Sequence, residues 1–257
     1  MPGLVRDNVR LVYDEVGAGD PPMVFVHGWT CDRSHFAPQV ARYAAGHRCL
    51  AVDLRGHGQS DAPQQDYTIE GFADDVAWMC DQLSVNGAVL VGHSMGGAVV
   101  LALAAARPDL ACAMAMLDPA ILFPPEALAL IPQLAAAFGG PGGMDTLRQF
   151  EDGQFFRPAS DAALKQQVLD AAVKTPQHVV ASAFANIVKF DAEAALRAVR
   201  VPIMNVDADP VLGDHTRLLA ASPGAVIGRT VGSGHFHQLE VPDQINAMLD
   251  RFLAIAL

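Results

Sequence analysis

The sequence predicts a doubly wound α/β fold, in which helices cover both faces of a mostly parallel sheet. Short, largely apolar runs, each bounded by turn residues, recur at 23–26, 49–52, 88–91, 113–117, 203–206 and 225–231. Runs in which apolar residues do not alternate with polar ones are typical of strands buried on both faces of a parallel sheet. Segments with helical spacing separate several of these runs, and parallel neighbours need such crossover helices.

Length and composition limit the number of domains and the class of partner. The chain has 257 residues, of which 51% are hydrophobic and 18% charged, and this is typical of a single globular domain that carries an insertion. Its net charge of −11 repels phosphate backbones and anionic lipid headgroups. We therefore expect neither nucleic acid nor a membrane as partner, and the sequence leaves the formation of a homo-oligomer open.

The first two strands and the first long helix have distinct patterns. Residues 4–6 and 9–16 flank Asp7-Asn8, which predicts an antiparallel hairpin at the edge of the sheet. Apolar residues at helical spacing predict an amphipathic helix over 69–83. Its stripe consists of Ile69, Phe72, Ala73, Val76, Ala77, Cys80 and Leu83.

The alternation of strands and helices fails between residues 119 and 200. Ala- and Leu-rich segments there are broken by Pro and Gly clusters, among them the Gly-rich residues 139–143. We predict a helical cap at 119–200, inserted into a core of residues 1–118 and 201–257. Because the cap leaves and re-enters at adjoining strand ends, it should cover the carboxyl edge of the sheet, where open α/β folds bind ligands. The alternative is a second helical layer with no part in the site.

The most informative motif is Gly92-His93-Ser94-Met95-Gly96-Gly97, between the run 88–91 and an apolar helix predicted over 98–106. A sharp turn from strand to helix strains the backbone of Ser94, and side chains at Gly92 and Gly96 would collide with it. Ser94 is then an exposed candidate nucleophile, and the Met95 amide at the start of the helix is a candidate oxyanion donor. A phosphate-binding loop is the weaker alternative, because no Lys-Ser/Thr pair follows.

A second motif, Val26-His27-Gly28-Trp29-Thr30, ends an early buried strand. We expect this loop beside the turn at Ser94, with the Trp29 amide as the second oxyanion donor. For His27 we expect a buried imidazole that hydrogen-bonds the loop into shape, and for Cys31 a packing role. The four cysteines, Cys31, Cys49, Cys80 and Cys112, form no C-x-x-C pair, which predicts buried free thiols and no zinc site.

The candidate general base is His235 in Gly234-His235-Phe236-His237, after the last predicted strand. A serine hydroxyl needs a base within hydrogen-bond reach. We prefer His235 to His237 because His235 comes immediately after the glycine turn. We expect His237 to be a supporting or solvated residue. The remaining histidines considered, His57, His93 and His215, have no better claim.

Three aspartates are candidates for the carboxylate that holds the imidazole in one tautomer. Asp207 and Asp209 follow the run 203–206, and Asp118 follows the run 113–117. We favour Asp209, because Pro210 fixes a turn that would direct its side chain towards His235. Asp207 and Asp118 remain alternatives.

Together these motifs resemble those of the α/β-hydrolase family. The matching segments are His27-Gly28-Trp29, residues 53–60, residues 92–97, Asp209-Pro210 and Gly234-His235-Phe236, in the family's order of nucleophile, acid and base. The resemblance implies a mostly parallel sheet of the eight-stranded type, a triad of Ser94, Asp209 and His235, and an oxyanion hole from the Trp29 and Met95 amides. It also implies structural roles for Arg55 and His57. It is weak across the cap, and the acid loop lacks the Gly usual in the family.

The predicted function is hydrolysis of carboxylic esters through an acyl-enzyme, without cofactor or metal. The expected substrate is a small, largely apolar ester in contact with apolar cap residues. These are Leu128, Leu130, Ile131, Leu134, Phe138, Phe150, Phe155 and Phe156. Family members that cleave halides or epoxides need an aspartate where this chain has Ser94.

Two alternatives use the same residues. One is hydrolysis of a carbon–carbon bond in a diketone-like acid, for which a cation would hold the substrate carboxylate. The candidate cations are Arg148, Arg157, Lys174 and Lys189. The other is a ligand receptor that keeps the fold without turnover.

The sequence also gives an expectation about location. The N-terminal residues lack the basic and apolar pattern of a signal peptide, and no apolar run is long enough to span a bilayer. We therefore expect a cytoplasmic protein.

Overall fold

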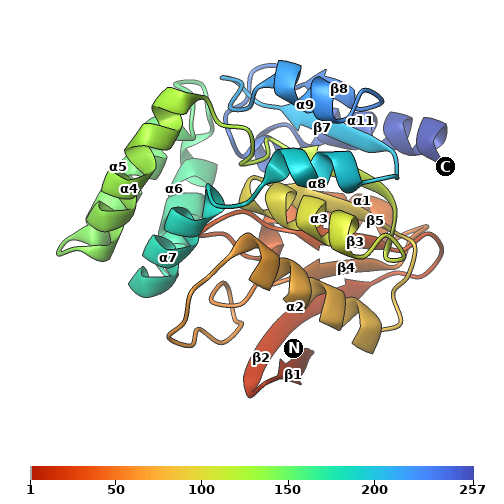
Figure 1. Cartoon of the computed structure of the whole chain (residues 1–257), viewed down its shortest axis with the longest axis horizontal. Helices are drawn as coiled ribbons and strands as arrows, with labels where there is room; N and C mark the ends of the chain where they lie inside the picture. Colours follow the sequence, from red (N-terminus) through yellow and green to blue (C-terminus); the bar gives the residue numbers. More distant parts are fainter. Residues whose placement is uncertain (1) are drawn as a thin grey trace.

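The computed structural model describes residues 2–257 and contains one eight-stranded sheet with the order β1-β2-β4-β3-β5-β6-β7-β8. The strands are β1 (Gly3–Arg6), β2 (Val9–Val16), β3 (Met23–Val26), β4 (Cys49–Val52), β5 (Ala88–His93), β6 (Ala111–Leu117), β7 (Ile203–Asp207) and β8 (Val226–Arg229). All neighbours from β4 to β8 are parallel, whereas β2 is antiparallel to both β1 and β4. The predicted doubly wound, mostly parallel sheet is confirmed (Figure 1).

The predicted hairpin at the sheet edge is confirmed as well. Strand β1 pairs with β2 from Arg6 opposite Val9 outward, so Asp7 and Asn8 form the two-residue turn. Both turn residues have positive φ, 51° and 62°, which is the backbone that a type I′ hairpin turn requires. Asp and Asn tolerate this left-handed region better than most residues, so the pair fits its position.

Helices cover the two faces of the sheet in the way that the alternation of side chains along the strands dictates. Val24 and Val26 belong to the apolar cluster under α2, α3, α8 and α9, whereas Met23 and Phe25 belong to the cluster under α1 and α11. The helices of the core are η1 (Arg33–Phe36), α1 (Ala37–Tyr43), α2 (Ile69–Gln82), α3 (Met95–Ala106), α8 (Ala192–Ala198), α9 (His215–Ala221), α10 (His237–Glu240) and α11 (Pro242–Ala256).

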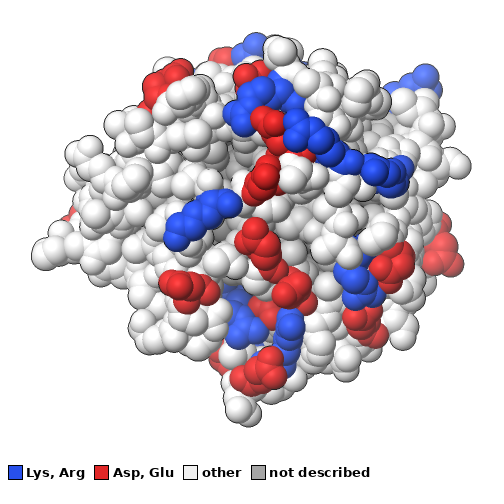
Figure 2. Space-filling view, viewed as in Figure 1, with Lys and Arg blue, Asp and Glu red and all other residues white. Residues whose placement is uncertain are grey.

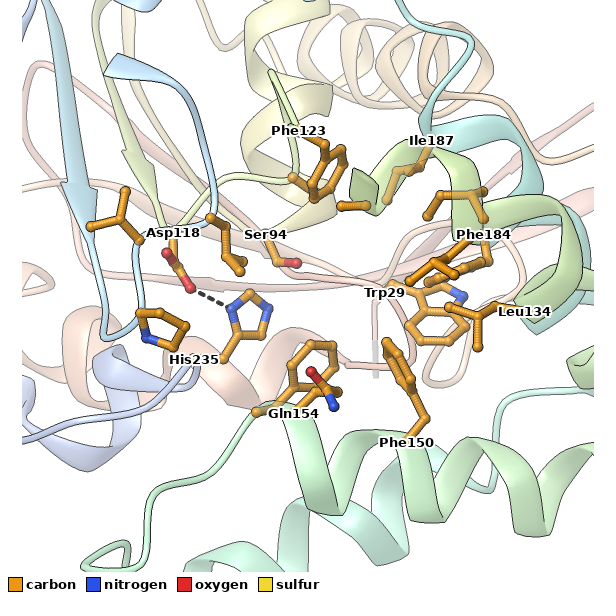
Figure 3. Close-up of a pocket in the computed structure, with 18 of the residues that line it drawn as sticks. Trp29, Ser94, Asp118, Phe123, Leu134, Phe150, Gln154, Phe184, Ile187 and His235 are labelled. Carbon is orange, nitrogen blue, oxygen red and sulfur yellow. Dashed lines mark hydrogen bonds and ion pairs between the residues drawn. The ribbon is translucent and has the colours of Figure 1, made fainter. Parts of the chain in front are cut away.

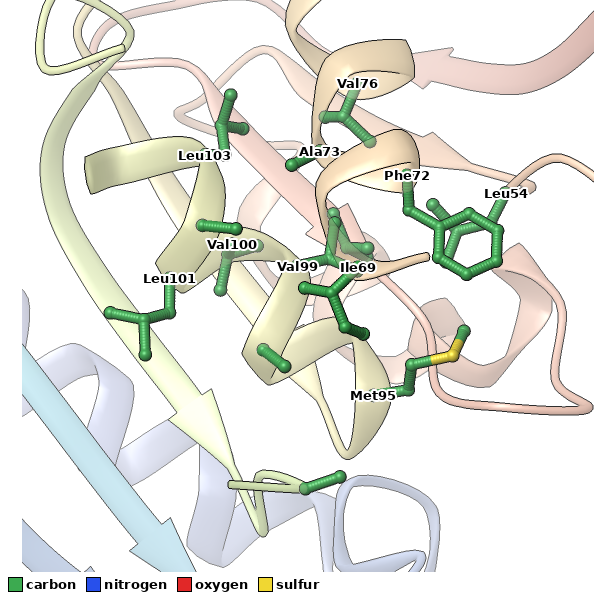
Figure 4. Close-up of a cluster of buried hydrophobic side chains, with 14 of the residues drawn as sticks. Leu54, Ile69, Phe72, Ala73, Val76, Met95, Val99, Val100, Leu101 and Leu103 are labelled. Atoms are coloured by element: carbon green, nitrogen blue, oxygen red, sulfur yellow. The ribbon is translucent and has the colours of Figure 1, made fainter. Parts of the chain in front are cut away.

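Helix α3, which follows Ser94, lies at the centre of the larger cluster. It is apolar on every side and almost wholly buried, because the sheet lies beneath it and α2 and α8 pack against it. Residues of the predicted stripe of α2, among them Phe72 and Val76, belong to the same buried apolar cluster as Val99 of α3 (Figure 4). The rigid packing of α3 therefore fixes the place where the helix begins.

Four helices of the predicted insertion stand apart from the sheet (Figure 1). They are α4 (Pro125–Gly139), α5 (Gly143–Gln154), α6 (Ala162–Ala172) and α7 (Gln177–Ile187). The fifth helix of this stretch, α8, packs against α3 and α9 in the layer that covers the sheet. The stretch 119–200 thus contains four helices outside the core layers and one helix within them.

The surface combines both signs of charge. On the face drawn in Figure 2, basic and acidic side chains lie close together, whereas the surface over α4 and α5 is largely uncharged. Arg107, for example, pairs with Asp81 and Asp109. Among the helices in residues 2–257, none combines the length and the apolar character needed to cross a bilayer.

The turn between β5 and α3 yields a prediction about stability. An added Cβ at Gly96 would lie 2.1 Å from the Val26 carbonyl oxygen and 2.5 Å from that of His27. We expect Gly96→Ala to lower the free energy of unfolding by about 1–3 kcal/mol or more, because the backbones must separate. The measurement is chemical denaturation of the purified proteins.

Gly153→Ala is the matched control, because Gly153 lies in α5 with open space around its Cα. We expect this change to stabilise the chain by about 0.5–1 kcal/mol through higher helix propensity. Equal stability of the Gly96→Ala and Gly153→Ala variants would contradict the close approach at Gly96.

Candidate active site

Ser94 lies in a strained turn between β5 and α3. Its φ of 53° and ψ of −119° are rare for a residue with a side chain and cost about 1–3 kcal/mol. The turn is held by hydrogen bonds: the Ser94 amide donates to Leu117 O at 2.9 Å, and the Ser94 carbonyl accepts from the amides of Gly97 and Ala120. A Cβ at Gly92 would lie 2.2 Å from the Gly96 carbonyl oxygen. The predicted strained turn with obligatory glycines is confirmed.

The loop after β3 packs directly against this turn. A Cβ at Gly28 would lie 3.1 Å from Ser94 Cβ and 3.0 Å from His93 Nδ1, so only glycine fits here without displacing its neighbours. Trp29, the next residue, lines the same cavity as Ser94. The predicted position of this loop beside the turn is confirmed.

His27 holds the loop in place, as expected. The Leu54 amide donates to His27 Nε2 at 3.0 Å, so the ring proton is on Nδ1, which donates to Gly28 O at 2.7 Å. Burial lowers the pKa of His27 to about 4, which keeps the imidazole neutral and preserves this pair of hydrogen bonds.

His235 and Asp118 form a buried pair. His235 Nδ1 lies 2.6 Å from Asp118 Oδ2, and the other carboxylate oxygen accepts from the Ala208 amide at 3.2 Å. Both side chains are nearly inaccessible to solvent, and both line the cavity that contains Ser94. Figure 3 shows Asp118 on the side of the imidazole ring that faces away from the cavity.

The predicted contact between Asp209 and His235 is wrong. Asp209 is exposed at the rim of the cavity and forms an ion pair with Arg229. Strand β6 is hydrogen-bonded to β5, and β7 lies one strand farther away, so the residue that follows β6 is nearer to Ser94. Asp118 therefore contacts the imidazole because of the order of strands in the sheet, which the sequence alone does not reveal.

Asp207 is also occupied elsewhere. Its Oδ1 accepts from Asn205 Nδ2 at 2.8 Å, and its Oδ2 lies 2.7 Å from His215 Nε2. Asn205 and Asp207 are two residues apart on one strand and therefore share a face of the sheet. Burial raises the pKa of the Asp207 carboxyl.

Two residues support His235 that we did not single out for that role. His93 Nε2 donates to the His235 carbonyl at 2.9 Å, and burial holds the pKa of His93 well below its usual value, so its ring is neutral. Phe155 stacks on the His235 ring with centroids 4.4 Å apart, and its carbonyl accepts from the His235 amide at 2.8 Å. The position of His93 beside Ser94 was the available signal, whereas nothing in the sequence linked Phe155 to His235.

A cavity of about 310 Å³ opens above Ser94 and His235. The predicted cap residues Leu130, Ile131, Leu134, Phe150 and Phe155 line it, together with Trp29, Phe123, Phe184 and Ile187 (Figure 3). Three predicted contacts lie elsewhere: Phe138 packs against Trp29, Phe156 stacks on Phe236, and Leu128 borders another hollow. Within residues 2–257, no group of three or more His, Cys, Asp or Glu side chains is arranged to hold a metal ion.

Comparison with known proteins agrees with this architecture. The sequence profile of the Alpha/beta hydrolase family matches residues 23–248. The crystal structure of the enol-lactonase from Burkholderia xenovorans LB400 superimposes with a TM-score of 0.89 and 26% identity, covering 98% of this chain and 100% of that one. The fold thus defines an α/β protein with a strained serine turn, and the chain belongs to the alpha/beta hydrolase family.

Curated relatives match over shorter stretches. The chain is 39% identical over 116 residues to the 2-(acetamidomethylene)succinate hydrolase of Mesorhizobium japonicum, covering 45% of this chain and 40% of the relative. It is 37% identical over 118 residues to a bifunctional esterase/perhydrolase of Acinetobacter calcoaceticus, covering 45% of this chain and 43% of the relative. The alignments span less than half the length of these relatives.

Proposed function

We propose that the protein hydrolyses carboxylic esters, with Ser94 as nucleophile, His235 as general base and Asp118 as the orienting carboxylate. The observation that carries the proposal is the buried His235–Asp118 pair at 2.6 Å on the wall of the cavity that contains Ser94. Asp118 accepts from Nδ1–H of His235 and so leaves Nε2 free to take a proton.

The reaction proceeds in two halves. His235 takes the hydroxyl proton as Ser94 Oγ attacks the ester carbonyl, and the amides of Trp29 and Met95 hold the oxyanion of the tetrahedral intermediate. Collapse breaks the bond to the alcohol oxygen, which receives the proton from His235 and leaves as the alcohol. Water then attacks the acyl-enzyme in the same way, releases the carboxylic acid and restores Ser94.

Arg157 supports a preference for substrates that carry an acid group. It is the one cation among our four candidates that lines the cavity, whereas Arg148 pairs with Asp170 and Lys174 borders another hollow. Within residues 2–257, no carboxylate lies at ion-pair distance from Arg157, and its Nε is buried without a hydrogen-bond partner. Hydrolysis of a carbon–carbon bond in a diketone-like acid is the second candidate function, because Arg157 would also bind the carboxylate of such a substrate.

The first prediction of the proposed function concerns the nucleophile. We expect a fluorophosphonate probe to label the wild type and not Ser94→Ala, and we expect the variant to lose ester turnover, because no other hydroxyl occupies the strained turn. Mass spectrometry and an assay with short p-nitrophenyl esters provide the measurements. Full ester turnover by Ser94→Ala would refute the proposal, and turnover of a diketone-like acid without any ester would favour the second candidate.

The second prediction concerns the acid. We expect Asp118→Asn to lower kcat by roughly four orders of magnitude, as the equivalent loss does in Ser-His-Asp triads, because the imidazole is no longer held in the reactive tautomer. Asp209→Asn is the matched control: its side chain is exposed and paired with Arg229, so kcat should hardly change. The opposite ranking in steady-state kinetics would return the role to Asp209.

The third prediction concerns Arg157. For an ester that carries a carboxylate, we expect Arg157→Gln to raise KM by roughly tenfold or more, because a charge-assisted hydrogen bond is lost. KM for a neutral ester of equal length should stay the same. Lys189→Gln removes an exposed cation outside the cavity and should leave both values unchanged. Equal effects of Arg157→Gln on the two esters would exclude this role.

A further inference from the structure

Glu151 is a buried carboxyl group that the proposed reaction does not use. It lies on α5, has an exposed fraction of 0%, and its Oε1 is 2.5 Å from Thr30 Oγ1. Thr30 follows Trp29, the residue whose amide we assign to the oxyanion hole. The contact therefore connects a cap helix to the loop that forms part of the site.

The hydroxyl of Thr30 has two oxygen neighbours. Thr30 Oγ1 is 2.5 Å from Glu151 Oε1 and also 2.5 Å from the carbonyl oxygen of Trp29. A hydroxyl carries a single proton, and a carbonyl or a carboxylate can only accept. Both contacts are full two-centre hydrogen bonds at the same time only if Glu151 is a carboxylic acid, which donates to Thr30 while Thr30 donates to Trp29.

The surroundings of Glu151 also favour the neutral acid. Its second oxygen, Oε2, is buried and has no hydrogen-bond partner among residues 2–257, which is costly for an ionised carboxylate. Burial raises the pKa of Glu151 to about 7. The hydrogen bond to Thr30 and the positive charges of His35 and Arg148 lower it by less than burial raises it.

The groups that face Glu151 come from three elements. Cys31 lies in the loop after β3, and His35 lies in η1. Burial raises the pKa of the Cys31 thiol. Arg148 comes from α5 itself, and its guanidinium pairs with Asp170 of α6 at 2.9 Å. His35 Nδ1 in turn lies 3.6 Å from Asp32 Oδ1, so both cations near Glu151 are already paired with another carboxylate.

We propose that Glu151 is a positioning residue, which as a neutral acid holds the Thr30 hydroxyl on the Trp29 carbonyl and so keeps the oxyanion loop in its active shape. Ionisation transfers the hydrogen bond of Thr30 from the Trp29 carbonyl to the carboxylate, because bonds to a charged acceptor are stronger. The inference rests on the proposed function, since it assigns Trp29 to the oxyanion hole.

The loop depends on such side-chain bonds. Thr30 has a φ of 61°, a strained value for a β-branched residue, which the surrounding contacts must maintain. When the Thr30 bond is lost, the weak Cys31 thiol at 3.3 Å is the one donor that the described residues still offer to the Trp29 carbonyl. The Trp29 ring is held separately by its Nε1–H, which donates to Val180 O of α7 at 3.0 Å. Loss of the Thr30 bond should thus disturb the backbone while the ring stays anchored.

The test compares kcat of Glu151→Gln with that of the wild type across pH 5.5–9. A glutamine amide donates to Thr30 at every pH and so imitates the acid. We expect the variant-to-wild-type ratio to be near 1 below pH 6 and to rise roughly tenfold as the pH passes through about 7, with KM unchanged. Dividing the two kcat values cancels the titration of the other site groups, because these groups are the same in both proteins.

Three further variants complete the experiment. Asp152→Asn changes an exposed carboxylate on the same helix and should give a ratio of 1 at every pH. Thr30→Val lacks the hydroxyl, so its kcat should be below that of the wild type at pH 6 and approach it at pH 9, and this variant carries the test if Glu151→Gln fails to fold. The Thr30→Val, Glu151→Gln double variant should match Thr30→Val.

A flat ratio for Glu151→Gln, or for Thr30→Val if Glu151→Gln does not fold, overturns the inference. It leaves the proposed function standing if Ser94→Ala is inactive and every folded variant still reacts with the fluorophosphonate probe. Ester turnover by Ser94→Ala would instead refute the proposed function, whatever the Glu151 ratio is.

Discussion

The close backbone contact at the turn between β5 and α3 is the constraint on which the site depends. The Gly96 Cα lies against the carbonyls of Val26 and His27, and no side chain fits there. This contact joins the two loops that follow β3 and β5, and it holds Ser94 in a backbone conformation that a free chain would avoid. The large apolar cluster around α3 supplies the packing that maintains the strain.

The helices outside the core layers form part of the site in addition to covering it. The segment after α5 contacts His235 twice, because the Phe155 ring stacks on the imidazole and the Phe155 carbonyl accepts from the His235 amide. Position 234 requires glycine, because a Cβ there would lie 2.4 Å from the same carbonyl oxygen. Helix α7 accepts a hydrogen bond from the Trp29 ring. A movement of these helices would therefore alter His235 and Trp29 together.

Buried neutral imidazoles provide the remaining polar framework. His27 and His93 each have a pKa lowered by burial, and each uses a ring nitrogen to fix the backbone of a loop at the site. A neutral ring offers one donor and one acceptor, whereas a charged ring offers two donors and could not accept from the Leu54 amide. Desolvation thus gives these loops a defined hydrogen-bond pattern.

The sequence by itself determined the α/β fold, the edge hairpin, the strained turn at Ser94 and the histidine after the last strand. These features are encoded locally, by residue period, by turn residues and by glycines at fixed distances from a strand end. Only the tertiary structure decided that Asp118 and not Asp209 contacts His235, because that choice depends on the order of strands in the sheet. It likewise decided that Phe155 stacks on His235 and that Glu151 contacts Thr30, since contacts between distant segments arise from packing that no local pattern specifies.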